Sequence, residues 1–256
     1  MRRHVSLSLE PMLAIVFTMT LLTSCASRTS KEDAADVPSY SVSRTTAPIA
    51  LDGRLDEADW QRAEERTMLD AYTGGAPPQK STFRMLWDDK YLYVGVYFED
   101  HDAWATYTQE DDKLWEEEVL EIFIDADKDG NTYYEYEINP LNVKVDLFLH
   151  RNRERVDHWR EWDFKDIKSG VYVEGDGKNA GTEDKYWSIE VAIPFADLYE
   201  MERNPPADGD TWRMNVYRIE RDNPTDRTEI FLAAFSPPYS GNFHATWMFG
   251  EIVFEK

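Results

Sequence analysis

Glu121 and Glu137 are the residues of this sequence that most clearly could bind a ligand or react with one. Neighbouring strands would bring the two glutamates together. They lie in Val119–Asp125 and Tyr133–Asn139, where hydrophobic and polar residues alternate as in strands with one buried side. If the hydrophobic sides of both strands face the core, the register sets the two glutamates directly opposite each other. Facing carboxylates destabilise a sheet unless a ligand or a cation lies between them. The sequence therefore predicts a ligand surface at this pair.

A third segment, Val143–Arg151, extends the predicted surface. Its alternation favours Val145, Leu147 and Leu149 on the core side of the sheet. Asn139 adds an amide to the polar side. The alternative is an ordinary solvent-exposed face, because the chain has 50 acidic residues.

A second candidate site is the loop Asp125-Ala-Asp-Lys-Asp-Gly130. Asp125, Asp127 and Asp129 match the first half of a calcium loop, in which alternate oxygens surround one ion. The second half does not match, because Tyr136 stands where a bidentate glutamate is required and the flanks are predicted strands. The loop is therefore either a calcium site or a plain hairpin turn.

The candidate site residues lie in or beside short segments rich in Val, Ile, Tyr, Phe and Trp. Clusters of Asp, Gly, Asn and Pro separate these segments. Such segments are typical of antiparallel strands. The expected strands are Phe83–Trp87, Tyr91–Phe98, Val119–Asp125, Tyr133–Asn139, Val143–Arg151, Val171–Glu174, Trp187–Ile193, Trp212–Glu220, Glu229–Phe235 and Glu251–Phe254. Helical signals are limited to Asp56–Arg66 and one turn at Phe195–Leu198. The expected fold class is all-β, an antiparallel β-sandwich of jelly-roll type with about ten strands and one or two short helices.

Charge and composition exclude several classes of protein. The chain has 28 basic and 50 acidic side chains, and its net charge of −22 repels nucleic acids and anionic lipids. Aromatic residues make up 14% of the chain, too many for a disordered acidic polypeptide. We expect one folded domain over residues 48–256, with Trp60, Trp187 and Trp212 in its core.

The amino terminus has the features of an export signal. A basic start precedes the apolar run Met12–Leu22, which is too short to cross a bilayer, so residues 1–24 are expected to be cleaved. The tetrapeptide Leu-Thr-Ser-Cys25 resembles the lipobox of bacterial lipoproteins, whose cysteine is lipidated. We expect residues 25–47 to be a flexible tether. The protein would then be exported and lipid-anchored to the cell envelope, at the outer membrane or a periplasmic face.

Six ordered segments of the chain resemble family 9 carbohydrate-binding modules and their stand-alone relatives. One of them reads Leu-Trp-Glu-Glu-Glu-Val-Leu-Glu-Ile-Phe-Ile-Asp. Together they extend over about residues 48–255. The segments are Ile49–Trp60, Met85–Val94, Leu114–Asp125, Trp187–Pro194, Met214–Arg218 and Asn242–His244 with Phe249–Phe254.

The resemblance implies a β-sandwich that holds a sugar between two aromatic rings, with polar side chains binding the hydroxyl groups. Trp115 matches the first ring, and Glu121 and Asn139 match polar ligand residues. Glu137 stands where the xylanase-borne members have an arginine. Phe243 stands where those members have a second tryptophan.

Two further positions bear on the implied site. Trp247 is the alternative second ring, and Ser240 stands where an asparagine would help to bind the sugar. The resemblance predicts non-catalytic binding of a mono- or oligosaccharide, in association with glycan-degrading enzymes. It also includes structural calcium, in agreement with the loop at Asp125.

Two other functions are compatible with the sequence. A glycoside hydrolase would use Glu121 and Glu137 as paired carboxylates, about 5 Å or 6.5–9.5 Å apart, although an acidic chain offers such pairs by chance. The chain has no Gly-rich phosphate loop, no H-E-x-x-H and no G-x-S-x-G motif.

Similar sandwiches, such as the cytochrome domain of cellobiose dehydrogenase, bind haem through Met with His or Lys. The methionines available for this role, which inside a strand more often fill the core, are Met85, Met201, Met214 and Met248.

Overall fold

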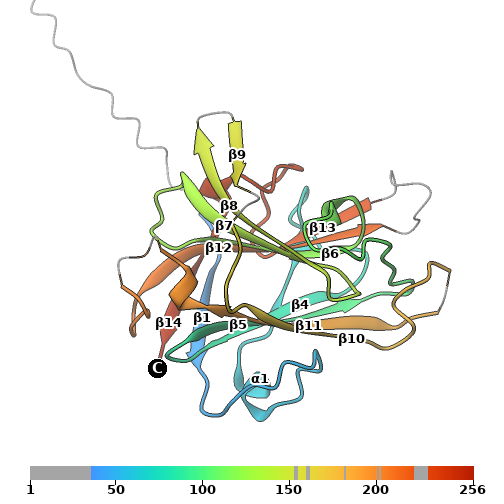
Figure 1. The fold of residues 1–256 in the computed structure, drawn as a ribbon, viewed down its shortest axis with the longest axis horizontal. Helices are drawn as coiled ribbons and strands as arrows, with labels where there is room; N and C mark the ends of the chain where they lie inside the picture. Colours follow the sequence, from blue (N-terminus) through green and yellow to red (C-terminus); the bar gives the residue numbers. More distant parts are fainter. Residues whose placement is uncertain are drawn as a thin grey trace, which may run out of the picture. The chain divides into compact units, whose positions relative to one another are not determined.

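In the computed structural model, the described part of the chain forms one β-sheet that folds over into two layers (Figure 1). The described residues are 36–152, 155–159, 162–181, 183–199, 201, 203–221 and 230–256. The predicted signal, residues 1–24, and Cys25 lie outside them. Among the residues that are described, no helix is long and apolar enough to cross a membrane.

The strands of the two layers come from alternating parts of the chain. One layer contains β10 (Lys168–Val173), β11 (Tyr186–Pro194), β5 (Tyr91–Glu99) and β4 (Ser81–Trp87). The other contains β12 (Thr211–Arg221), β6 (Val119–Asp125), β7 (Thr132–Ile138), β8 (Lys144–Asn152) and β9 (Arg155–Trp159). Between them in the sheet order lie β1 (Ser39–Arg44) and β14 (Gly250–Glu255). The short strands that pair outside this order are β2 (Arg66–Thr67), β3 (Leu69–Asp70) and β13 (Ile230–Ala234).

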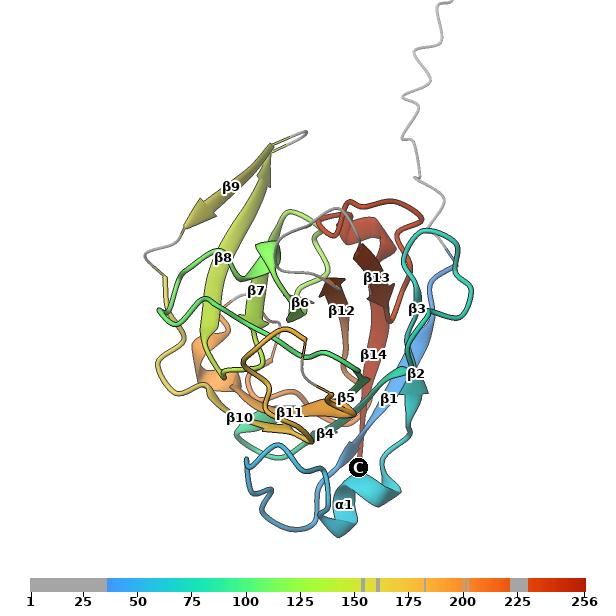
Figure 2. The ribbon, with the colours of Figure 1, turned by 90° about the vertical axis from the view of Figure 1, so that its right-hand side faces the viewer.

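The helical elements of the described residues are short, as expected. The helix α1 (Ala58–Arg62) forms within the predicted segment Asp56–Arg66. It lies on the outer side of β4 and β5 (Figure 2). Trp60 of this helix belongs to one hydrophobic cluster with Leu86 and Tyr93. The 3₁₀ turns are Leu114–Glu116, Phe195–Asp197 and Thr246–Met248, the second of which matches the predicted turn after Pro194.

The main hydrophobic core lies between the two layers. Alternate residues enter it from each layer, such as Val94 and Val96 of β5 and Ile122 and Ile124 of β6. This is the arrangement that the strand period of two produces when one side of each strand faces the other layer. The predicted core tryptophans are all buried; they are Trp60, Trp187 and Trp212.

The all-β class is confirmed, but the sheet that the described residues form is mixed and has fourteen strands instead of about ten antiparallel ones. The strands that were not expected are β1, β2, β3 and β9. The parallel pairings are those of β1, which is parallel to both β14 and β4. This strand lies inside the predicted tether of residues 25–47, so the folded part begins earlier than residue 48. Tyr40 and Val42 alternate with serines in β1 and are 1% and 0% exposed. Their burial explains why a serine-rich stretch is held in the sheet.

The register predicted for β6 and β7 is confirmed, and the side predicted for β8 is wrong. Glu121 lies opposite Glu137, as expected. However, Glu137 also lies opposite Val145 and Glu135 opposite Leu147, so the apolar residues of β8 share the side of the glutamates. The reason is a second hydrophobic cluster, which covers this side of the layer and includes Val145 and Leu147. Both sides of β8 are therefore covered by other parts of the chain.

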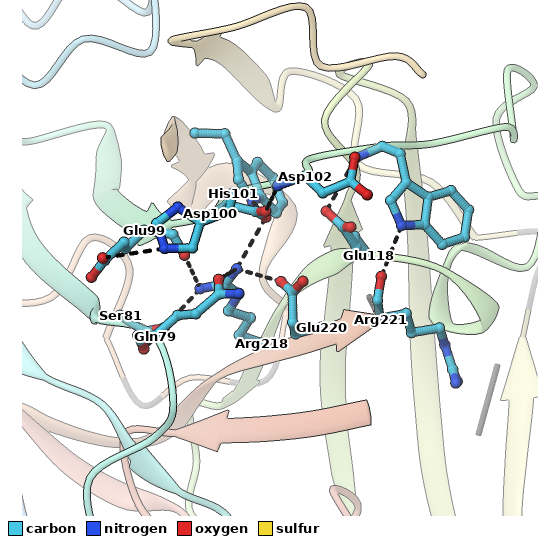
Figure 3. Close-up of polar contacts among 12 residues, drawn as sticks. Gln79, Ser81, Glu99, Asp100, His101, Asp102, Glu118, Arg218, Glu220 and Arg221 are labelled. Atoms are coloured by element: carbon cyan, nitrogen blue, oxygen red, sulfur yellow. Dashed lines mark hydrogen bonds and ion pairs between the residues drawn. The ribbon is translucent and has the colours of Figure 1, made fainter. Parts of the chain in front are cut away.

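Arg218 of β12 joins the two layers beside the end of β5 (Figure 3). Its fully buried guanidinium donates to Asp100 Oδ2 at 3.0 Å and forms an ion pair with Glu220 of its own strand. It also donates to the carbonyl oxygen of Glu99 at 2.8 Å. Glu118 lies beside these groups, and its Oε1 is buried without a hydrogen-bond partner. This network fixes the start of β6, next to the candidate site.

Candidate functional site

A cavity of about 410 Å³ opens on the side of the β6–β7–β8 layer that faces away from the main core. Residues of β6, β7, β8, β12 and β13 line it together with the 3₁₀ turn before β6 and the segment after β13. The lining residues are Trp115, Glu121, Glu135, Glu137, Leu147, Ile219, Leu232, Gly241, Phe243 and His244. The cavity therefore combines aromatic and aliphatic surface with carboxylates, a composition typical of small-molecule sites.

Three glutamates bring a concentrated negative charge to this cavity. Glu121 of β6 and Glu135 and Glu137 of β7 are 3%, 5% and 0% exposed. One oxygen from each lies within 4.8 Å of the others. Burial, and then the charge of Glu135, raises the pKa of Glu121 well above its usual range. The glutamates can accept hydrogen bonds from hydroxyl or amino groups, and they can surround a cation.

Two aromatic rings border the cavity. Trp115 lies in the 3₁₀ turn Leu114–Glu116, is half-buried, and packs against the second hydrophobic cluster. Its carbonyl oxygen accepts a hydrogen bond from Arg221 at 3.4 Å. The Phe243 ring stacks on Tyr217 with a centroid distance of 3.9 Å and an interplanar angle of 8°. One side of Phe243 is thus covered by the protein, which leaves Trp115 as the larger accessible ring.

A model of the carbohydrate family 9 binding domain-like proteins matches residues 51–256. The chain belongs to this family. An extracellular protein of Arthroderma benhamiae is 29% identical to this family 9 domain over 185 residues, which is 70% of this chain and 80% of the relative. The endo-1,4-beta-xylanase A of Thermotoga maritima is 31% identical over 102 residues, which is 37% of this chain and 9% of the enzyme. The domain thus matches a small part of the xylanase.

Solved structures share the fold of this family 9 domain. A putative carbohydrate-binding protein from Bacteroides uniformis superposes with a TM-score of 0.66 at 17% identity, over 85% of this chain and 99% of the other. A family 9 carbohydrate-binding module from Caldicellulosiruptor kristjanssonii, in complex with glucose, superposes with a TM-score of 0.61 at 17% identity. That alignment covers 85% of this chain and 95% of the module. The likeness establishes the β-sandwich architecture.

Most of the residues predicted for the sugar site come together, with the exception of Asn139. Its Nδ2 donates to the carbonyl oxygen of Tyr107 at 3.0 Å, and its Oδ1 accepts from the backbone N–H groups of Leu141 and Val143 at 3.0 Å each. The amide thus holds the β7–β8 turn against the loop before β6, and it does not line the cavity. In this family 9 domain Asn139 positions the backbone around the site.

The alternative residues for the second ring and its neighbour also lie outside the cavity lining. Trp247 is 46% exposed, and the adjacent Thr246 donates to the carbonyl oxygen of Gly130 at 2.9 Å. Trp247 therefore stands beside the β6–β7 loop. The hydroxyl of Ser240 donates to the carbonyl oxygen of Pro238. Phe243 is the predicted second ring that the structure places at the cavity.

Sequence reasoning missed Glu135 and His244 as site residues. Glu135 is two positions before Glu137, so the strand alternation already placed it on the same side. His244 comes from the segment after β13, and its Nδ1 lies 2.8 Å from the hydroxyl oxygen of Tyr133 and 4.0 Å from Glu135 Oε2. No local pattern around His244 could predict this contact, because it depends on how a loop crosses the sheet.

The β6–β7 loop has the donor set for a calcium ion. One oxygen from each of Asp125, Asp127 and Asp129 lies within 4.8 Å of the others. Asp125 is 1% exposed, and its Oδ1 is buried without a hydrogen-bond partner. Carboxylate oxygens in this arrangement are the ligands that calcium prefers. The same loop also has hairpin contacts, since the N–H of Gly130 donates to Asp125 Oδ2 at 3.0 Å. The three aspartates therefore could bind a calcium ion, but the turn also has hydrogen bonds of its own that do not depend on the ion.

Two of the four methionines considered for haem ligation are core residues. Met85 and Met214 are fully buried in the main core between the layers. Met201 packs against the margin of that core, and Met248 lies in the last 3₁₀ turn. Core packing explains the two buried methionines without a cofactor.

Proposed function

We propose that this family 9 domain binds a saccharide in the cavity beside Trp115 without changing it chemically. The observation that supports this most strongly is an accessible indole next to buried carboxylates in one cavity. The apolar face of a pyranose stacks on an aromatic ring, while its hydroxyl groups donate to fixed charged acceptors. The modules of Caldicellulosiruptor kristjanssonii in complex with glucose and with cellotriose share the fold and support a sugar ligand.

Isothermal titration against mono- and oligosaccharides tests the proposal. We expect Trp115→Ala and Glu121→Gln each to weaken binding by about tenfold or more, because one removes the stacking surface and the other a charged acceptor. Neither substitution should lower the melting temperature substantially. Trp247→Ala is the matched control, since it removes an exposed indole outside the cavity and should leave affinity unchanged.

Two results would contradict this site assignment. If Trp115→Ala unfolds the domain, the ring belongs to the core; if neither cavity variant changes affinity, the sugar binds elsewhere. Hydrolysis of the titrated oligosaccharides that disappears in Glu137→Gln would show that the carboxylates are catalytic. The proposed function predicts no hydrolysis in either protein.

We also propose that the domain is exported and held at the cell envelope by lipidated Cys25, where it supports glycan-degrading enzymes. The lipobox-like Leu-Thr-Ser-Cys25 after a short apolar run supports the anchor. Matches to an exoglucanase and to xylanases support the association with glycan degradation. Calcium bound by Asp125, Asp127 and Asp129 is part of the same proposal and would stabilise the loop beside Trp247.

A further inference from the structure

The charges that line the sugar cavity are strongly one-sided. Glu121, Glu135 and Glu137 line it, and no lysine or arginine does so among the described residues. His244 is the basic side chain present, and its Nδ1 already contacts the hydroxyl oxygen of Tyr133 at 2.8 Å. Anionic sugars such as uronates would be repelled from such a cavity. Its charge complements a cationic ligand.

The three carboxylates lie close enough together to accept hydrogen bonds from a single ammonium group. One oxygen from each of Glu121, Glu135 and Glu137 lies within 4.8 Å of the others. An ammonium nitrogen donates in tetrahedral directions to oxygens at about 2.8 Å, which sets those oxygens about 4.6 Å apart. One –NH₃⁺ group can therefore donate to all three residues. A neutral hydroxyl group has one hydrogen and can satisfy one acceptor.

The burial of the glutamates gives such a ligand an energetic advantage. Buried carboxylates close together are costly unless a counter-charge accompanies them. The raised pKa of Glu121, caused by burial and by Glu135, reflects this cost in the ligand-free domain. A cation in the cavity would offset it, whereas a neutral sugar would not.

We propose that the cavity selects an amino sugar, with the pyranose ring against Trp115 and the protonated amine among Glu121, Glu135 and Glu137. This inference rests on the proposed function, since it names the class of saccharide that the same cavity binds. The cavity and the family membership establish the candidate site independently of the glutamates. The ligand class is therefore a glucosamine-type mono- or oligosaccharide with a free amine.

Titrations with matched ligands test the selectivity. Glucosamine, N-acetylglucosamine and glucose are compared at about pH 6, where the amine is protonated, in the presence of a chelator. Oligosaccharides of glucosamine and of glucose extend the comparison. We expect the amine-bearing ligand to bind at least about tenfold more tightly than its acetylated and neutral counterparts.

Variants of Glu137 separate this electrostatic selection from general sugar binding. Glu137→Gln should reduce the preference for the amine, and Glu137→Arg should abolish or reverse it while neutral sugars still bind. Glu183→Gln is the matched control, because it removes an exposed carboxylate outside the cavity lining and should leave the preference intact. Melting temperatures of all variants verify that the domain is folded.

The outcomes distinguish this inference from the proposed function. Equal or tighter binding of glucose overturns the amino-sugar inference and leaves sugar binding intact. Binding of neutral sugars that appears only when calcium replaces the chelator also overturns it, because a metal ion would then occupy the glutamates. If no saccharide binds under either condition, the proposed function fails as well.

Discussion

Glu118 illustrates how a single buried carboxylate can reduce the stability of its own fold. Burial, and then the charges of Glu220 and Asp100, raises its pKa well above the usual range. Its Oε2 accepts one hydrogen bond, from the N–H of Trp104 at 3.3 Å, while Oε1 accepts none. Arg218 balances part of the surrounding charge. The folded domain therefore binds a proton at Glu118 more tightly than the unfolded chain does.

The Glu118→Gln variant should consequently be more stable than the native domain at neutral and higher pH. The stabilisation from the raised pKa is present below the unfolded pKa and is lost as pH rises through the folded pKa. Glutamine cannot lose a proton, so Glu118→Gln does not lose this stabilisation, and its advantage in unfolding free energy should be larger at about pH 8 than at about pH 5. Denaturant unfolding at both pH values measures it. The exposed control Glu183→Gln should show no such growth, and a constant or negative difference for Glu118→Gln would contradict the argument.

At the scale of elements, β8 shows the limit of the alternation pattern. Alternation divides the residues of a strand into two sets, but it identifies the core side only when the other side faces water. In β8 the apolar set, with Val145 and Leu147, packs in the second hydrophobic cluster next to the glutamates. The cavity exists because this second side is also covered, since loops over the layer supply Trp115 and Phe243.

The β6–β7 loop is the element at which bound calcium would change the stability of the domain. An ion that binds only the folded state adds about 2.7 kcal/mol at a hundredfold excess over its dissociation constant. We expect the melting temperature to be higher in millimolar calcium than in chelator, and Asp127→Asn or Asp129→Asn to reduce the shift. Asp56→Asn, which removes an exposed aspartate elsewhere, should retain it. Equal melting temperatures with calcium and chelator would leave the loop as a hairpin turn alone.

At the scale of the whole molecule, the predicted lipid anchor determines where the protein is located in the cell and does not affect how the domain folds. The Cys25→Ala variant should be soluble after export, because the acyl chains would be the attachment to the membrane. Ser27→Ala is the matched control and should remain in the membrane fraction. Fractionation of cells that express each variant measures the difference. Membrane association of Cys25→Ala equal to that of the native protein would contradict lipidation.

The sequence by itself determined the all-β class, the β6–β7 register and the burial of Trp60, Trp187 and Trp212. These features depend on local periodicity and on hydrophobicity, which neighbouring residues encode. It also indicated Trp115 and Glu121, because they belong to a contiguous segment that resembles a known family.

The tertiary structure decided the features that depend on distant segments. β1 joined the sheet because β14 and β4 provide parallel partners for its backbone, and the side of β8 followed from the loops above it. The amide of Asn139 forms hydrogen bonds with backbone groups of Tyr107 and Leu141. The glutamates became the lining of a cavity when the segment with Phe243 and His244 crossed beside β6 and β7. Hydrogen bonding and burial across such separations are set by the folded chain, and no local pattern encodes them.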